Sequence, residues 1–225
     1  LSAHQIRTSL SASKWIIKMF LDGDLGKLNT EQETLMQRAY EDNDRAIATV
    51  SELLLANKTE NIGEKKYDFK KIDPIELIDD CIFDFSGEAH IHEVEIIFLK
   101  PEEKFPNIYA DKEKIRIAIQ NLVENAIKYS DKHGKIFITL REEKNFVEVS
   151  IKNTGTRISE AGKNKIFSKF YRDPEAQKKE VIGTGIGLFT TQKIIEGNNG
   201  KIWFESDKNM GTTFFFTIPK YQSPK

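Results

Sequence analysis

Apolar or small side chains recur in steps of three and four residues through the first sixty positions of the chain. The recurring positions are Ile6, Leu10, Ser13, Ile17 and Phe20, followed by Met36, Ala39, Tyr40, Ala46, Ile47, Val50, Leu53 and Leu54. A spacing near 3.5 residues is typical of the seam of a helical hairpin or coiled coil. Residues 21–30 predict the turn, and Thr30 with Glu33 resembles a capping box. Because two helices bury too little surface to be stable alone, residues 1–60 are expected to dimerise into a four-helix bundle.

The chain of 225 residues carries almost balanced charge and a single cysteine. Its 34 Lys and Arg residues oppose 35 Asp and Glu residues, which gives a formal net charge of −1. Nucleic-acid binding needs a basic excess, so the composition argues against a nucleic-acid partner. Cys81 has no second cysteine with which to form an intramolecular disulfide, and a lone thiol fits a reducing compartment.

The sequence shows neither a signal peptide nor an apolar run near the ~18 residues that a membrane span needs. It starts abruptly, three residues before His4 and inside a helical pattern. We therefore expect a cytoplasmic segment of a longer protein, in which any membrane contact comes only through segments further upstream.

Beyond residue 60 the pattern changes to an alternation of helices and strands. Residues 61–72 are polar and charged and are expected to form a linker. The periodicity predicts helices over 74–85, 111–130 and 188–196, and strands over 94–99, 136–140, 146–151, 202–205 and 212–218. Strands in runs with few crossovers indicate an α+β fold, in which helices cover one face of a mixed sheet. The polar segment 172–180 is expected to be a mobile lid.

A glycine-rich loop comes directly before the last predicted helix. Gly183, Gly185 and Gly187 alternate with other residues, and such a loop at a helix N-terminus exposes backbone N–H groups to an anion. A dinucleotide-binding fingerprint is disfavoured because no strand stands directly upstream, and a Walker loop is excluded because no Gly-Lys-Ser/Thr follows. The alternative is a flexible hinge.

The helix predicted over 111–130 places three polar side chains on one face. Asn121, Asn125 and Lys128 fall at i, i+4 and i+7. An amide oxygen is a suitable ligand for Mg²⁺, and a lysine one turn later can meet phosphate oxygens. The alternative is the ordinary polar outer face of an amphipathic helix.

His4 lies two positions from the apolar seam of the first predicted helix and is expected to point outward. Imidazole is nucleophilic near neutral pH and forms a labile phosphoryl adduct. The alternative is a solvated surface histidine.

Six segments, taken in order, resemble the signature boxes of sensor histidine kinases. They are 4–10, 121–129, 153–158, 166–172, 183–188 and 211–214. The resemblance covers nearly the whole chain. It implies a dimerisation and phosphotransfer hairpin at 1–60, a linker at 61–72 and an ATP-binding catalytic domain at 73–225. That domain would be an α/β sandwich of the histidine kinase, gyrase and Hsp90 type, with a mixed sheet and three main helices.

The resemblance further implies a protein-histidine kinase that uses ATP and Mg²⁺. His4 would accept the phosphoryl group and pass it to an aspartate in the receiver domain of a response regulator. Gln5 occupies the catalytic position directly after the histidine, and Thr8 stands where the family orients water for dephosphorylating that partner.

The implied nucleotide site draws on every later box. Asn125 would hold Mg²⁺ with Asn121 beside it, and Tyr129 would lie against the adenine. Lys128 and Arg172 would meet the phosphates. The other implied nucleotide contacts are Asn153, Gly155, Gly183, Thr184, Gly185, Gly187, Leu188 and Thr212.

Three residues depart from the family pattern. Gln5 replaces an acidic residue that takes the imidazole proton, and losing a positioned base costs about 10²–10⁴ in rate. Asn153 replaces an aspartate that accepts from the adenine amino group, and the lost charge assistance costs about 1–2 kcal/mol. Arg157 replaces a glycine, at about 1–3 kcal/mol if the position needs a positive φ.

These departures keep a second hypothesis open, a degenerate kinase that acts as a dimeric binding or phosphatase module with weak nucleotide binding. A third hypothesis is a kinase of serine in a partner protein, which shares the nucleotide fold. A helical hairpin with an outward histidine argues against the third.

Overall fold

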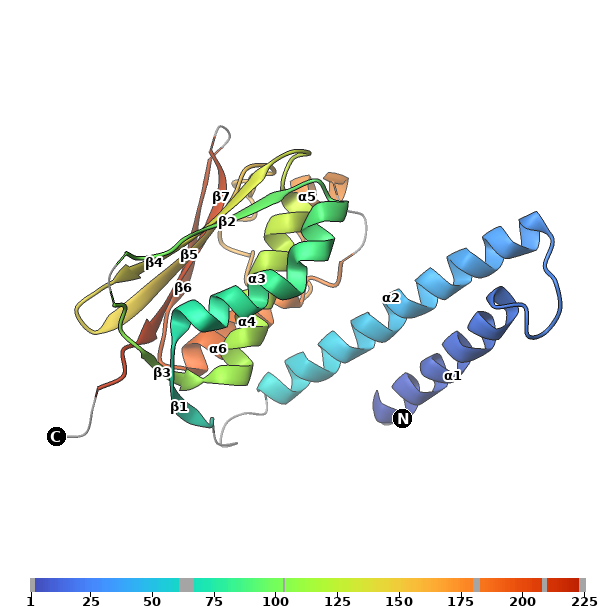
Figure 1. The fold of residues 1–225 in the computed structure, drawn as a ribbon, viewed down its shortest axis with the longest axis horizontal. Coiled ribbons are helices and arrows are strands. Elements are labelled where there is room, and N and C mark those ends of the chain that lie inside the picture. Colours follow the sequence, from blue (N-terminus) through green and yellow to red (C-terminus); the bar gives the residue numbers. More distant parts are fainter. Residues whose placement is uncertain (1–2, 61–66, 103, 180–182, 208–209, 223–225) are drawn as a thin grey trace. The chain divides into compact units, whose positions relative to one another are not determined.

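The computed structural model describes residues 3–60, 67–102, 104–179, 183–207 and 210–222. The chain divides into two compact units, Leu1–Lys58 and Thr59–Lys225. The first unit is helical and the second combines sheet and helices (Figure 1). None of the described helices is long and apolar enough to cross a membrane.

The first unit is the predicted helical hairpin, built from α1 (Ala3–Leu21) and α2 (Thr30–Glu60). The two helices run antiparallel, side by side (Figure 1), and the Lys14 ammonium pairs with the Asp44 carboxylate across them. Between the helices the chain passes through Gly23 and Gly26, whose φ angles of 83° and 109° favour glycine.

The cap of α2 lies one residue earlier than the sequence predicts. Asn29 Oδ1 accepts from the Gln32 backbone N–H at 2.8 Å, and Gln32 Oε1 accepts from the Asn29 N–H at 3.0 Å. This is a reciprocal capping box. The predicted pair of Thr30 and Glu33 is wrong because Thr30 is already the first helical residue.

The second unit contains the predicted mixed sheet, with five strands in the order β2-β4-β5-β7-β6. The strands are β2 (Glu95–Leu99), β4 (Lys135–Glu142), β5 (Phe146–Asn153), β6 (Ile202–Asp207) and β7 (Gly211–Pro219). β2 pairs parallel with β4, and the other neighbours pair antiparallel. The sheet order places β5 at the centre, where it is paired on both sides.

A separate two-stranded sheet pairs β1 (Phe69–Ile72) with β3 (Ile108–Asp111). The expected linker at 61–72 therefore ends in a strand. Lys70 and Lys71 make this strand polar, and its pairing partner lies far along the chain, so the local pattern gives no strand signal.

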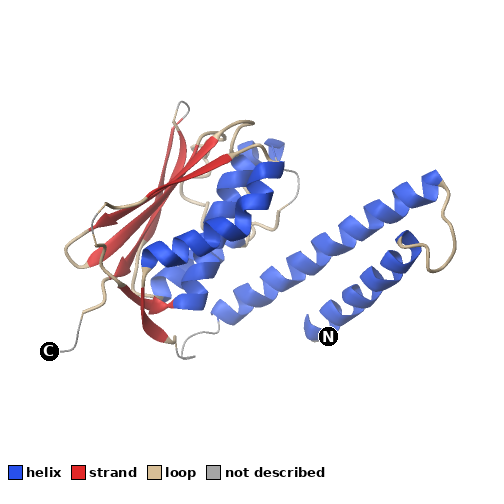
Figure 2. Cartoon of the chain, in the orientation of Figure 1, coloured by secondary structure: helices blue, strands red, loops and turns tan. Residues whose placement is uncertain are grey.

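Three main helices cover one face of the five-stranded sheet (Figure 2). They are α3 (Pro74–Ile91), α4 (Lys112–Tyr129) and α6 (Gly187–Gly197). Asp73 and Asp111 cap α3 and α4, with Pro74 at the first position of α3. A short helix, α5 (Pro174–Lys179), occupies most of the segment 172–180, which the sequence predicts to be a mobile lid.

The core lies between this sheet face and α4. Ile115, Ile119 and Leu122 of α4 are buried, as the apolar spacing predicts. Along β5 the alternating side chains of Val147, Val149 and Ile151 are buried too. Because side chains in a strand alternate between faces, Asn153 continues this buried row as its last member. The core pattern of the strand thus places a polar side chain at the edge of the core.

Asp111 links four elements of the second unit. Its carboxylate accepts from Lys114 Nζ at 2.9 Å, from Lys114 N at 3.2 Å and from Asp68 N at 3.1 Å. Its own N–H donates to Asn198 Oδ1, beyond the end of α6, at 2.8 Å. Burial alone would raise the pKa of Asp111, but these hydrogen bonds outweigh burial and hold the pKa below its usual value.

Replacing Asp111 with asparagine is expected to lower the free energy of unfolding by about 1 to 3 kcal/mol near neutral pH. Asparagine is an equally good N-cap but keeps one acceptor oxygen, so the change removes the charge together with one of the two oxygens that accept from Lys114 and Asp68. Because the folded pKa lies below the unfolded one, this contribution is complete above the unfolded pKa and disappears as the pH falls through the folded pKa. Denaturant unfolding across acidic pH should show the two proteins converging, and a pH-independent difference would contradict this role.

Candidate functional site

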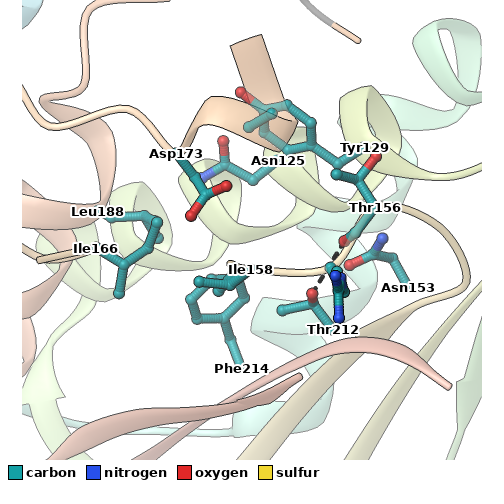
Figure 3. Close-up of a pocket in the computed structure, with 12 residues that line it drawn as sticks. Asn125, Tyr129, Asn153, Thr156, Ile158, Ile166, Asp173, Leu188, Thr212 and Phe214 are labelled. Carbon is teal, nitrogen blue, oxygen red and sulfur yellow. Dashed lines mark hydrogen bonds between the residues drawn. The ribbon is translucent and has the colours of Figure 1, made fainter. Parts of the chain in front are cut away.

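A hollow opens between α4, the ends of β5 and β7, and the segments before and after α5. Its volume is about 420 Å³ when the space open to solvent is included. The walls are largely apolar, from Ile158, Ile166, Leu188 and Phe214. Figure 3 shows Leu188 and Ile166 at one side of this pocket and Asn153 with Thr212 at the other. A slot of this kind suits the flat faces of an aromatic ligand.

The pocket brings together five of the residues singled out from the sequence, carried by four separate parts of the chain. They are Asn125, Tyr129, Asn153, Leu188 and Thr212. Arg157, the departure in the loop after β5, lines the same pocket and is exposed. Residues separated by almost ninety positions in sequence therefore meet in one cavity.

Asn121 and Asn125 share a helix face but differ in their contacts. The Asn121 amide donates to Thr191 Oγ1 at 3.2 Å and to the Gly187 carbonyl at 3.4 Å, so it holds the start of α6. Asn125 lines the pocket, and its side chain makes no hydrogen bond to any residue that the structure describes. Asn125 therefore keeps its amide oxygen available to a ligand, and Asn121 acts as a support.

The two basic side chains implied for phosphate binding lie outside the pocket lining. The Lys128 ammonium pairs with Glu124 one turn earlier on α4. Burial alone would lower the pKa of Lys128, but the hydrogen bond and charge of Glu124 raise it, so the ammonium stays protonated. The Arg172 guanidinium lies against Gly183, where an added Cβ would stand 3.3 Å from Cζ. Arg172 thus lies beside the glycine loop.

The glycine loop is shaped by close backbone contacts. Gly185 has a φ of 69°, and a Cβ there would lie 2.7 Å from the Phe170 carbonyl carbon and 2.7 Å from Tyr171 O. The Phe170 N–H donates to the Gly185 carbonyl at 3.0 Å. At the N-terminus of α6, Ile186 gives no side-chain cap. The residue at the N-cap therefore leaves the first N–H groups of α6 without a side-chain partner from that position.

Gly155 and Thr184 support the pocket from outside its lining. Gly155 pairs with Ser130, and a Cβ on it would lie 2.2 Å from the Tyr129 carbonyl oxygen, so only glycine fits. The Thr184 hydroxyl accepts from the Ile186 N–H at 3.3 Å and steadies the loop before α6.

Asp173 is a pocket residue that the sequence interpretation missed. It is 2% exposed, and its Oδ2 accepts from Ser159 N at 3.0 Å and Ser159 Oγ at 2.7 Å. Its Oδ1 accepts from Glu175 N at 2.9 Å at the start of α5. The carboxylate therefore ties the loop after β5 to α5. An Asp-Pro pair is an N-cap signal that could have located it, although not its bond to Ser159.

His4, Gln5 and Thr8 lie in α1, in the other compact unit. The side chains of His4 and Gln5 fall outside the described part of the chain, whereas Thr8 is exposed. Within the described residues no cluster of three or more His, Cys, Asp or Glu side chains could hold a metal ion.

Comparison with known proteins agrees with this geometry. Residues 110–222 match the family described as histidine kinase-, DNA gyrase B-, and HSP90-like ATPase. Sensor histidine kinase WalK of Bacillus subtilis (strain 168) is 29% identical over 96% of this chain and 35% of its own length. Adaptive-response sensory-kinase SasA of Prochlorococcus marinus subsp. pastoris is 31% identical over 98% of this chain and 57% of its own length. The chain thus spans from about a third to somewhat over half of these relatives.

Solved structures resemble both parts of the chain. The catalytic domain of histidine kinase ThkA superposes with a TM-score of 0.60 at 34% identity, covering 68% of this chain and 98% of that domain. ThkA in complex with response regulator protein TrrA superposes with a TM-score of 0.68 at 26% identity, covering 96% of this chain and 61% of that one. WalK and ThkA are named as histidine kinases and SasA as a sensory kinase, and the chain therefore belongs to the family of histidine kinase-, DNA gyrase B- and HSP90-like ATPases.

Proposed function

We propose that this chain is the catalytic core of a two-component sensor histidine kinase, which transfers the γ-phosphoryl group of ATP to His4 and then to an aspartate of a response regulator. The observation that carries the proposal is the pocket. It combines a free amide on α4 with a buried amide at the end of β5, and its lining residue Leu188 directly follows the glycine loop that opens α6. The complex of ThkA with a response regulator supports a receiver domain as the partner.

In this proposal the adenine enters the apolar slot and the phosphates extend toward the glycine loop. Tyr129 and Leu188 would contact the base, because both line the slot, while Asn153 would pair with its edge and Thr212 would line the wall beside it. The phosphates need cations or N–H donors and would lie by Gly183, Gly185 and Gly187, within reach of Arg172. Lys128 would join them by leaving Glu124, with which it forms a half-buried ion pair.

Asn125 fits the requirements of a Mg²⁺ ligand. Its amide faces the pocket without a hydrogen bond to a described residue, and a neutral oxygen is a hard donor of the type that Mg²⁺ accepts. Bound Mg²⁺ would neutralise charge on the triphosphate. Because the Asn121 amide already donates to residues of α6, Asn125 is the one Mg²⁺ ligand that we assign from α4.

The transfer breaks the bond between the γ-phosphorus and the β–γ bridging oxygen and forms an N–P bond to the His4 imidazole. ADP leaves with the electron pair of the broken bond, and the imidazole must lose its ring proton. Gln5 has no basic form, so this proton has to pass to solvent or to another group. Thr8 would position a water molecule for a separate reaction, the hydrolysis of the phosphorylated partner.

The proposed organisation follows the two compact units. Residues 1–60 would form the dimerisation and phosphotransfer hairpin, 61–72 the connection and 73–225 the catalytic domain. Trp15, Ile16 and Leu35 are 64%, 50% and 57% exposed in the single chain, which supports a homodimer that covers them in a four-helix bundle. We place the activity in the cytoplasm, where ATP and receiver domains occur.

Incubation with ATP labelled on the γ-phosphate, in the presence of Mg²⁺, tests the proposal. We expect labelled protein whose label is lost in acid, survives in base and moves to an added receiver domain. Acid-stable label would contradict transfer to histidine. Binding of ADP without any labelling would favour the alternative of a degenerate kinase, which the names of the relatives do not support.

Replacing Gly185 with alanine is expected to weaken ADP binding by about tenfold or more. The Cβ would meet the Phe170–Tyr171 backbone at 2.7 Å in a conformation of positive φ, so the phosphate loop must shift. Titration calorimetry measures the effect. Gly87→Ala is the matched control because its Cβ meets nothing within 4 Å, and it should leave the affinity unchanged. Unchanged affinity in Gly185→Ala would remove the loop from the proposed site.

A further inference from the structure

Asn153 presents a buried amide to the pocket. It is the last residue of β5, is 4% exposed and lines the cavity. Its Nδ2 is fully buried and has no hydrogen-bond partner in the described part of the chain. Buried polar groups are nearly always paired in folded proteins, so an unpaired donor inside a pocket indicates a group that pairs with a ligand.

The other polar side chains on the walls near it are already engaged. Thr212 Oγ1 donates to the Thr156 carbonyl at 3.1 Å (Figure 3) and lies 2.9 Å from Ser206 Oγ. The two oxygens of Asp173 accept from Ser159 and Glu175. Among these buried wall groups of the described chain, Asn153 is the one that holds a hydrogen-bond donor without a partner.

An amide and a carboxylate read a purine edge differently. Adenine presents an amino donor at C6 beside the acceptor N1, whereas hypoxanthine and guanine present an acceptor O6 beside a donor N1–H. A carboxylate only accepts, so it matches the adenine amino group and opposes O6. An amide has one acceptor and one donor side by side, and turning it by half a rotation exchanges them. One asparagine can therefore pair with either edge.

We propose that Asn153 makes this site tolerant of purines that carry a carbonyl at C6, so that inosine and guanosine nucleotides bind alongside adenine nucleotides. The inference rests on the proposed nucleotide-binding function and concerns the same pocket. Arg157, which lines the pocket, offers only donors and so does not oppose a carbonyl oxygen. The apolar walls contact the faces of the base and do not distinguish the two edges.

Calorimetric titration of the complete chain with ADP and with IDP tests this tolerance. IDP is the sharper probe because it differs from ADP only at N1 and C6, while GDP also carries an amino group at C2. We expect the two affinities to agree within about tenfold. In Asn153→Asp the ADP affinity should rise by about tenfold through charge assistance and the IDP affinity should fall, which widens the ratio to about hundredfold.

Asn145→Asp is the matched control, because it introduces the same charge at the exposed turn between β4 and β5, away from the pocket. It should leave the ratio of ADP to IDP affinity unchanged. Thermal unfolding without nucleotide checks that each variant is folded, and the wild-type ratio decides the question without any variant.

Two results would overturn the inference while leaving the proposed function intact. One is an IDP affinity more than about hundredfold below that for ADP in the wild type. The other is an unchanged ratio in folded Asn153→Asp, which would mean that residue 153 does not meet the base. Failure of ADP itself to bind would overturn the proposed function and this inference together.

Discussion

Replacing His4 with alanine is expected to abolish phosphoryl transfer to the chain. An imidazole nitrogen supplies both the nucleophile and the labile N–P bond, and alanine supplies neither. ADP binding should persist unchanged, because the pocket is built entirely from the unit Thr59–Lys225. Intact-mass measurement at neutral pH after incubation with ATP and Mg²⁺ gives the result directly.

His90→Ala is the matched control for the change at His4. His90 is exposed near the end of α3, so its removal should leave both labelling and fold intact. Phosphoryl label that persists in His4→Ala would assign the acceptor to another residue. Loss of ADP binding in His4→Ala would instead indicate a defect of folding.

Replacing Asn125 with alanine is expected to lower autophosphorylation by on the order of a hundredfold. The change removes the proposed protein ligand of Mg²⁺ and leaves the apolar slot in place. ADP affinity should therefore lose most of its dependence on Mg²⁺, while affinity measured in a chelator stays close to that of the wild type. Asn125→Asp retains an oxygen ligand but adds negative charge close to the phosphates, and we expect it to weaken Mg²⁺-free ADP most.

Gln120→Ala is the matched control for Asn125, since it removes an amide from the same helix. Gln120 donates to Asp84 at 3.2 Å and does not line the pocket. Its loss should leave the dependence on Mg²⁺ unchanged. If Asn125→Ala weakened ADP equally with and without the metal, its role would be structural and the metal assignment would fail.

The sequence predicts the elements of the second unit wherever the pattern is strong and local. The apolar spacing of Ile115, Ile119 and Leu122 identifies α4, and the alternation in β5 identifies the central strand. The sequence does not predict the strand β1, because Lys70 and Lys71 interrupt its apolar pattern. Its pairing partner, β3, also lies some forty residues later. The cap of α2 shifts by one residue because both Asn29 and Thr30 are suitable caps.

The sequence likewise predicts only some features of the candidate site. The helical repeat places Asn121, Asn125 and Lys128 on one face, but it does not reveal which of them is free. Asn121 is held by Thr191, and Lys128 pairs with Glu124, so Asn125 remains. These distinctions depend on tertiary contacts that no local pattern encodes.

Asp173 and the unpaired amide of Asn153 also depend on tertiary contacts. The partner of Asp173 is Ser159, fourteen residues earlier, in a loop without regular structure. The amide of Asn153 is buried because the row of core residues on β5 extends one residue into the pocket. A family motif identifies the position, and packing shows what the residue there can bind.

Locating the phosphoryl group on the wild-type chain tests the proposed kinase most directly. After incubation with ATP and Mg²⁺, the protein is digested and its peptides are fragmented under conditions that never become acidic. We expect the phosphoryl group on His4, in the peptide from the start of α1. A phosphoryl group on His90, His92 or His133, or on any serine or threonine, would contradict the assignment.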